Sequence, residues 1–187
     1  EKLLDDEYVL VKYEIDGNQI LAPEYENVSA DLKAYQDDTA MQQNIWDYYA
    51  AMIPYDARSF LTYYIIATDG LGGGLAAVEQ DPDDPTLWML NVDIADSNNT
   101  EDLTFTLIHE YGHLLTLNTS QVDVDEYIFN NPDDEDAYAD AEYNCETYFT
   151  GEGCAKSSSY FYLFFDEFWV DFYDEWKFKT LALIRKK

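Results

Sequence analysis

Two histidines four residues apart, with a glutamate directly after the first, are the residues in this chain best suited to chemistry. The segment reads His109-Glu110-Tyr111-Gly112-His113, and the chain contains no other histidine. Positions four apart lie on one face of an α-helix, so imidazoles at this spacing can bind one metal ion. Glu110 would lie beside them, able to reach a metal-bound water without being a ligand. The alternative is a pair of structural histidines on a helix face.

The element that must position this pair is a helix that begins at Asn99 or Thr100 and ends near Leu117. Either of the first two residues can cap the helix, and two acidic residues follow in its first turn, where the helix dipole favours negative charge. Gly112 costs about 1 kcal/mol relative to Ala inside a helix, which predicts that something packs closely against it. An apolar stripe would bury one face of the helix: Leu103, Leu107, Tyr111 and Leu114.

The rest of the chain alternates between strand and helix patterns. An N-terminal hairpin is predicted over residues 7–22, with a turn at Asp16-Gly17-Asn18 and an interruption at Pro23. Apolar periodicity and turn residues further predict a helix over 29–52, strands over 60–67, 75–78 and 87–94, and an aromatic helix over 157–177. This order is an α+β pattern.

The segment Leu107–Leu115 resembles the active-site helix of the zincin metallopeptidases, which carry the HExxH motif. The layout before it is similar to the upper lobe of that fold, with a backing helix over 29–52 and a mixed β-sheet. The resemblance implies an upper lobe over residues 1–118 and a mostly helical or irregular lower lobe over 119–187. It also implies that the strand over 87–94 is the edge strand that pairs with substrate. Residues 144–169 are similar to uncharacterised secreted bacterial members of the group.

The same resemblance implies roles for the three residues of the motif. His109 and His113 would be zinc ligands, Glu110 the general base, and a peptide or protein the substrate. Zinc lowers the pKa of a bound water to about 7, and Glu110 would take its proton and deliver it to the leaving amine. A further donor, such as a tyrosine, would stabilise the oxyanion.

A catalytic zinc site needs a third protein ligand. The metzincin pattern would place glycine and histidine where this chain has Thr116 and Thr119, so that subgroup is excluded. The thermolysin-like, gluzincin-type group uses a carboxylate on a downstream helix instead. The acidic run near residues 134–142 is the nearest match, although it also suits a solvated surface. The candidates are Glu135, Asp136, Asp140, Glu142, Glu167 and Glu175, or the ligand is absent.

The two cysteines, Cys145 and Cys154, are predicted to form a disulfide. Gly151 and Gly153 let the chain turn back between them, and closing so short a loop contributes about 2–3 kcal/mol. Two unpaired thiols are the alternative, and the spacing is not that of a zinc ribbon. The disulfide, together with a chain that starts at Glu1 without a leader, predicts a secreted or extracellular location.

Charge and composition exclude several classes of protein. The 187 residues carry a formal charge of −29, with no Lys or Arg over residues 59–155. This argues against nucleic acid and anionic membranes as partners and favours basic residues in a substrate. An aromatic content of 17% argues against global disorder. No apolar run approaches the ~20 residues of a transmembrane segment.

The sequence therefore predicts a secreted zinc-dependent metallopeptidase that hydrolyses peptide bonds. The alternative is a catalytically inactive zincin-fold binding or scaffold module with an incomplete metal site. That alternative comes from the basic tail over residues 177–187, which offers no carboxylate and indicates a truncated or replaced lower lobe. A third interpretation is an acidic extracellular domain with structural histidines. The oligomeric state is left open.

Overall fold

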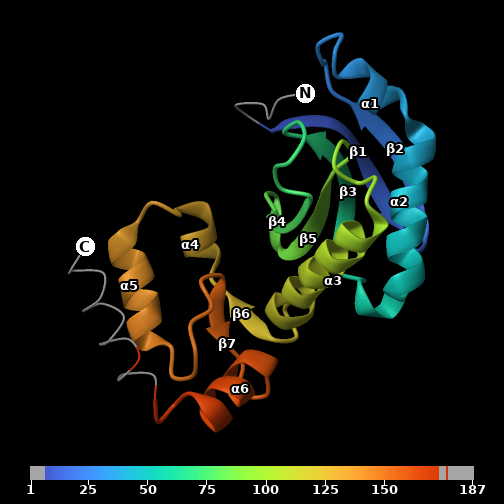
Figure 1. Cartoon of the computed structure of the whole chain (residues 1–187). Helices are drawn as coiled ribbons and strands as arrows, with labels where there is room; N and C mark the ends of the chain where they lie inside the picture. Colours follow the sequence, from blue (N-terminus) through green and yellow to red (C-terminus); the bar gives the residue numbers. More distant parts are fainter. Residues whose placement is uncertain (1–6, 173–175, 177–187) are drawn as a thin grey trace. The chain divides into compact units, whose positions relative to one another are not determined.

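A computed structural model describes residues 7–172 and Trp176 (Figure 1). The chain divides into two compact units, Glu1–Leu115 and Thr116–Lys187, and each is described by itself. The first holds a five-stranded mixed sheet and the second a two-stranded sheet, and six α-helices lie among the described residues. The predicted α+β class is confirmed. No helix in the described part of the chain is long and apolar enough to cross a membrane.

The large sheet has the strand order β2-β1-β3-β5-β4. β1 pairs antiparallel with both β2 and β3, β3 pairs parallel with β5, and β5 pairs antiparallel with β4. The strands are β1 (Tyr8–Asp16), β2 (Gln19–Tyr25), β3 (Leu61–Thr68), β4 (Ala76–Asp81) and β5 (Asp84–Asp93).

β1 and β2 form the predicted N-terminal hairpin, with Gly17 at a φ of +62° in its turn. Pro23 does not interrupt the hairpin, as the sequence had suggested, because β2 continues through it to Tyr25. The register shifts between Lys12 and Glu14, opposite Pro23, and β2 is an edge strand. Proline has no N–H to donate, so a bulge on an edge strand is where a sheet can accommodate it.

The edge strand on the other side of the sheet is β4, so the prediction that residues 87–94 form that edge is wrong. β5 lies between β3 and β4, and its residues from Trp88 to Asp93 are all buried. A continuous run of buried residues is typical of a strand that is covered on both faces and paired on both sides. β4 alternates between half-buried and exposed residues along most of its length, as a strand at the margin of a sheet does.

The helix predicted over 29–52 is divided into α1 (Lys33–Asp37) and α2 (Thr39–Met52). The division falls at Asp38, whose carboxylate accepts a hydrogen bond from the Met41 N–H at 3.0 Å. Aspartate competes in this way for main-chain donors and therefore favours a helix start over a helix interior.

The core of the first unit lies between the sheet and the helices α2 and α3 (Thr100–Leu117). The Trp46 ring of α2 lies 5.4 Å from the Tyr64 ring of β3, measured between centroids. Tyr48 of α2 and Thr104 of α3 share a hydrogen bond of 2.7 Å between their hydroxyls. Side chains with no exposed surface include Leu10, Val11, Trp46, Tyr49, Tyr64, Ile66, Leu90, Val92, Leu107 and Leu114.

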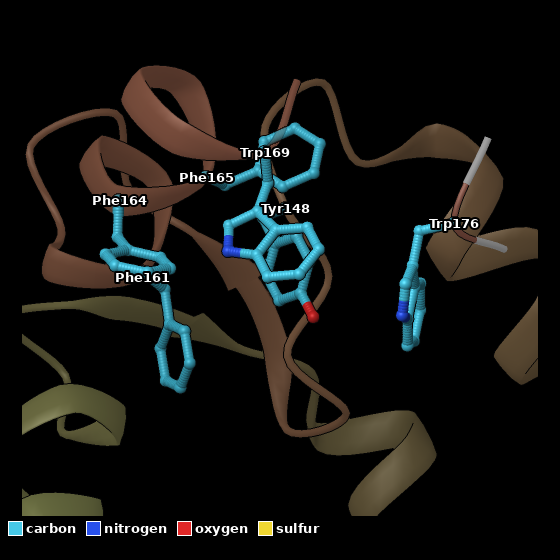
Figure 2. Close-up of a pocket in the computed structure, with 6 residues that line it drawn as sticks. All are labelled: Tyr148, Phe161, Phe164, Phe165, Trp169 and Trp176. Atoms are coloured by element: carbon cyan, nitrogen blue, oxygen red, sulfur yellow. The ribbon is translucent and has the colours of Figure 1, made fainter. Parts of the chain in front are cut away.

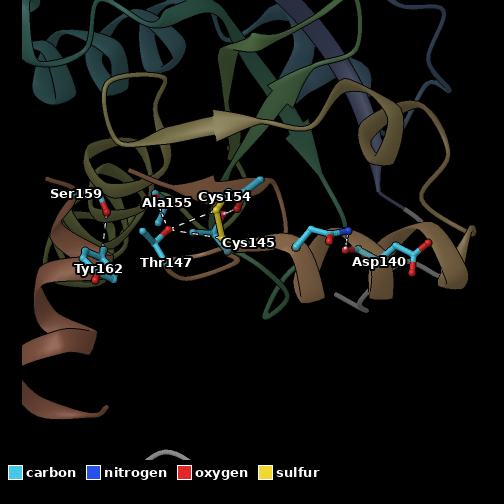
Figure 3. Close-up of a disulfide and its surroundings, with 10 residues drawn as sticks. Asp140, Cys145, Thr147, Cys154, Ala155, Ser159 and Tyr162 are labelled. Atoms are coloured by element: carbon cyan, nitrogen blue, oxygen red, sulfur yellow. Dashed lines mark hydrogen bonds between the residues drawn. A yellow bond between two sulfur atoms is a disulfide. The ribbon is translucent and has the colours of Figure 1, made fainter. Parts of the chain in front are cut away.

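The second unit contains the antiparallel pair β6 (Val122–Val124) and β7 (Gly153–Ala155) with three short helices. The helices are α4 (Glu126–Asn130), α5 (Glu135–Asn144) and α6 (Tyr160–Phe168). A disulfide joins Cys145, directly after α5, to Cys154 on β7, as predicted (Figure 3). Gly153 has no room for a side chain, since a Cβ there would collide with the main chain of Asp123.

α6 is shorter than the helix predicted over 157–177. The Ser159 hydroxyl accepts a hydrogen bond from the Tyr162 N–H at 3.1 Å and caps the helix, which ends at Phe168. Residues 173–175 and 177 lie outside the described residues. An apolar pocket beside α6 is lined by the rings of Tyr148, Phe161, Phe164, Phe165, Trp169 and Trp176 (Figure 2).

Candidate metal centre

α3 carries all three residues of the predicted site and begins where the sequence indicated. The Asn99 side-chain oxygen accepts a hydrogen bond from the Glu101 N–H at 3.0 Å, which satisfies one main-chain donor of the first turn. Leu103, Leu107 and Leu114 are buried. Their packing fixes the rotation of the helix about its axis and therefore fixes the face on which the histidines lie.

His109 and His113 lie side by side on the exposed face of α3. Their Nε2 atoms are 3.2 Å apart, and the ring planes are nearly perpendicular at 83°. A tetrahedral ion bound 2.0–2.1 Å from each of two ligand atoms would separate those atoms by about 3.3–3.4 Å. The observed separation is close to that value and also allows a hydrogen bond between the two rings, and both rings are accessible from solvent.

Glu110 lies between this pair and the edge of the sheet. It is only 7% exposed, and one of its carboxylate oxygens lies within 4.8 Å of a ligand nitrogen on each histidine. Its Oε2 accepts a hydrogen bond of 2.9 Å from the main-chain N–H of Val78 on β4. The sequence did not predict this contact, because Val78 and Glu110 are 32 residues apart and a main-chain donor leaves no residue-type signal.

Tyr49 of α2 lies in the electrostatic neighbourhood of Glu110. Burial raises the pKa of its hydroxyl; Arg58 opposes this increase, whereas Tyr111 and Glu110 add to it. Tyr49 has no exposed surface, and its hydroxyl has no hydrogen-bond partner among the described residues. A side chain so enclosed stays protonated and cannot contact a substrate, which removes it from the tyrosines considered for oxyanion stabilisation.

Gly112 does not have the close neighbour that its place in a helix had suggested. A Cβ at this position would meet no described atom within 4 Å apart from the neighbouring residues and backbone of its own helix. Packing therefore does not explain the glycine.

The candidate third ligands belong to the second unit. Glu135, Asp136, Asp140 and Glu142 are exposed on α5, and Glu167 is exposed on α6. Glu175 lies outside the described residues. α5 begins at Asp134, whose carboxylate accepts a hydrogen bond of 3.0 Å from the Ala137 N–H, so the acidic run is a helix rather than a solvated loop. The third ligand stays a prediction.

A second group of carboxylates, which was not predicted from the sequence, lies where β3 and β5 end and in the loops that follow them. Ligand atoms of Asp69, Asp93 and Asp96 lie within 4.8 Å of one another. The N–H groups of Gly72 and Gly73 donate to the Asp96 carboxylate, so the glycine-rich loop folds over these acids. β3 and β5 are parallel, so their ends lie at the same edge of the sheet. The aspartates at these two strand ends are the sequence feature that could have predicted the cluster.

Asp93 is the buried member of this acidic cluster. Burial raises its pKa to about 6, although the N–H groups of Asp69 and Ala95 donate to it and partly oppose the increase. The charged form is therefore disfavoured, and the side chain is protonated at a pH where an exposed aspartate is ionised.

Comparisons with protein-family models, with curated proteins and with solved structures give no significant match to this chain.

Proposed function

We propose that this chain is a zinc-dependent metallopeptidase of zincin type with thermolysin-like use of ligands. The observation that carries the proposal is the pair of imidazole nitrogens 3.2 Å apart beside a buried glutamate. Two histidines placed on the surface without a shared role would need neither this separation nor a neighbouring carboxylate. Here Glu110 is also held at 2.9 Å by the main chain of the neighbouring strand.

The arrangement around the motif helix supports the zincin assignment. The backing helix α2, the strands β3 to β5 and the motif helix α3 follow one another in the chain order that the resemblance implies. The antiparallel edge strand β4 contacts the motif helix through a hydrogen bond between Val78 and Glu110. An exposed strand edge can bind an extended peptide through main-chain hydrogen bonds, which would bring a substrate to the motif.

Each residue of the motif has a chemical role in this proposal. His109 and His113 would hold the zinc ion, which supplies Lewis-acid polarisation and lowers the pKa of water to about 7. Glu110 accepts a proton from the attacking water and donates it to the leaving amine. Its burial keeps bulk water from competing for its hydrogen bonds. The third ligand stays a prediction, and the acids of α5 and α6 are its candidates.

Location and substrate follow from the disulfide and the charge. We propose an extracellular setting, because the bond between Cys145 and Cys154 persists under oxidising conditions. Peptides with basic residues are the favoured substrates, since Glu79 is exposed on β4 and no Lys or Arg occurs over residues 59–155.

A non-catalytic zincin-fold scaffold is the second candidate. The observation that favours it is the composition of the His109 group, whose three members include only two imidazoles and the proposed base. Zinc binding without peptide cleavage would be its signature.

Peptide cleavage separates the two candidates. A mixed peptide library is incubated with zinc-supplemented wild type and with Glu110→Gln, and the products are identified by mass spectrometry. The peptidase proposal expects new termini with wild type and a loss of about 10²–10⁴-fold in kcat for Glu110→Gln. If zinc-loaded wild type cleaves no peptide, the peptidase proposal is wrong and the non-catalytic scaffold is the remaining candidate.

A further inference from the structure

The main-chain N–H of Val78 points away from the sheet to which its strand belongs. Val78 is paired with Leu90 across the antiparallel β4–β5 ladder. The Leu75 carbonyl accepts from the Asp93 N–H at 2.9 Å, so residues 75, 77 and 79 direct their polar groups toward β5. The groups of residues 76, 78 and 80 then point outward, and the Val78 N–H meets the Glu110 Oε2.

We propose that the Val78 N–H is a positioning group that fixes the carboxylate of Glu110 for proton transfer. The inference rests on the proposed function, because it assigns a part in that reaction. A glutamate has three side-chain torsions, and the last of these is broad. A charge-assisted hydrogen bond to one oxygen restricts that torsion and leaves the other oxygen to accept the proton.

The burial of Glu110 strengthens this assignment. The side chain is 7% exposed, so water does not readily replace the Val78 donor if that donor is lost. A carboxylate buried without its donor would turn toward the next available partner, and the base would lose its alignment. The Val78 N–H contacts neither metal nor substrate and acts only through Glu110.

The contact can be tested without any enzymatic activity. Hydrogen exchange of the Val78 amide is measured by NMR in metal-free wild type, in Glu110→Ala and in Glu110→Gln. We expect exchange at least about tenfold faster in Glu110→Ala, where the acceptor is gone. Glu110→Gln retains an acceptor oxygen and should keep part of the protection. The amides of Ala77 and Glu79, which face β5, are the controls and should not change. Equal Val78 exchange in wild type and Glu110→Ala would overturn the proposal.

Its catalytic consequence is tested by removing one hydrogen-bond donor. Replacing Val78 with its α-hydroxy analogue converts the amide to an ester and retains the side chain. The same ester in the Glu110→Gln background is the matched control, because a group that acts only through Glu110 has little further effect once that carboxylate is absent. We expect kcat to fall about 10–100-fold for the Val78 ester, with KM and zinc content within about threefold. A further loss of equal size in the Glu110→Gln background, or no loss for the Val78 ester alone, would contradict the positioning role.

The two proposals fail in different ways. If zinc-loaded wild type cleaves no peptide, the proposed function fails, whereas the exchange measurement still decides whether Val78 holds Glu110. If peptides are cleaved but Val78 exchange is independent of Glu110, the function stands and the positioning role is wrong.

Discussion

The two units of this chain are held together in different ways. In the first, aromatic and aliphatic side chains of the sheet, α2 and α3 are fully buried, and the motif lies on an 18-residue helix. In the second, neither α5 nor α6 has a buried residue, and a disulfide joins the end of α5 to β7. The first unit therefore holds the motif helix through its own packing. The second unit, which contains the candidate third ligands, buries fewer large side chains and adds a covalent link.

The same Leu→Ala substitution should change the free energy of unfolding by very different amounts in the two units. Leu107 is fully buried on α3, whereas Leu163 is 53% exposed on α6. Leu107→Ala should lower the free energy of unfolding by about 2–5 kcal/mol, and Leu163→Ala should stay within about 0.5 kcal/mol. Denaturant unfolding, with hydrogen exchange in β3 and α5 to separate the units, measures both. Similar losses at the two sites would contradict the comparison.

Removal of the disulfide should affect only the second unit. Replacing Cys145 and Cys154 together by serine should destabilise that unit by about 2–3 kcal/mol, because the unfolded chain regains the entropy of an open loop. Exchange of α5 amides should accelerate while that of β3 amides stays constant. Acceleration in β3 would show that the first unit also depends on the link.

The acidic cluster gives the first unit a pH dependence. The pKa of Asp93 is about 6 in the folded chain, above its usual 3.8, so folding binds a proton between these values. Stability is lost as pH rises from about 4 to 6, by an amount on the order of 3 kcal/mol. Asp93→Asn cannot ionise, so its stability relative to wild type should improve between pH 4 and pH 7. A constant difference, measured by thermal unfolding, would sink this account.

Glycine-to-alanine changes should have opposite signs in the two units. Gly112→Ala should stabilise α3 by about 0.5–1 kcal/mol, since a Cβ has open space and alanine is the better helix former. Gly153→Ala should destabilise the second unit, because the new Cβ would collide with the main chain of Asp123. Thermal unfolding of each variant decides the sign, and destabilisation by Gly112→Ala would reveal a close neighbour there.

Local sequence patterns predicted most of the helices and strands. The order of the strands in the sheet depends on pairing between distant segments, which local patterns do not encode. The cap at Asn99 and the leucine stripe specified α3 because both signals lie within the helix itself. The apolar runs of β4 and β5 both indicated strands. The edge position went to β4 because β5 pairs with β3 across some 25 residues of chain.

The candidate site shows the same division. The spacing of His109 and His113 follows from helix periodicity, so their proximity was predictable from sequence. The hydrogen bond from the Val78 N–H to Glu110 was not predictable, because a main-chain donor on a strand leaves no signal in residue type. The third ligand is the hardest residue to predict from the sequence. Its candidates lie on other helices, and the chain contains many acidic residues.

The zinc content of the purified chain tests the central claim most directly. Wild type, His109→Ala and His113→Ala are loaded with zinc, dialysed against metal-free buffer and analysed for bound metal. The account predicts about one equivalent per chain in wild type and less than about a tenth in each variant, because each removes one of only two imidazoles. Less than a tenth of an equivalent in wild type, or full retention in both variants, would contradict a zinc site on α3.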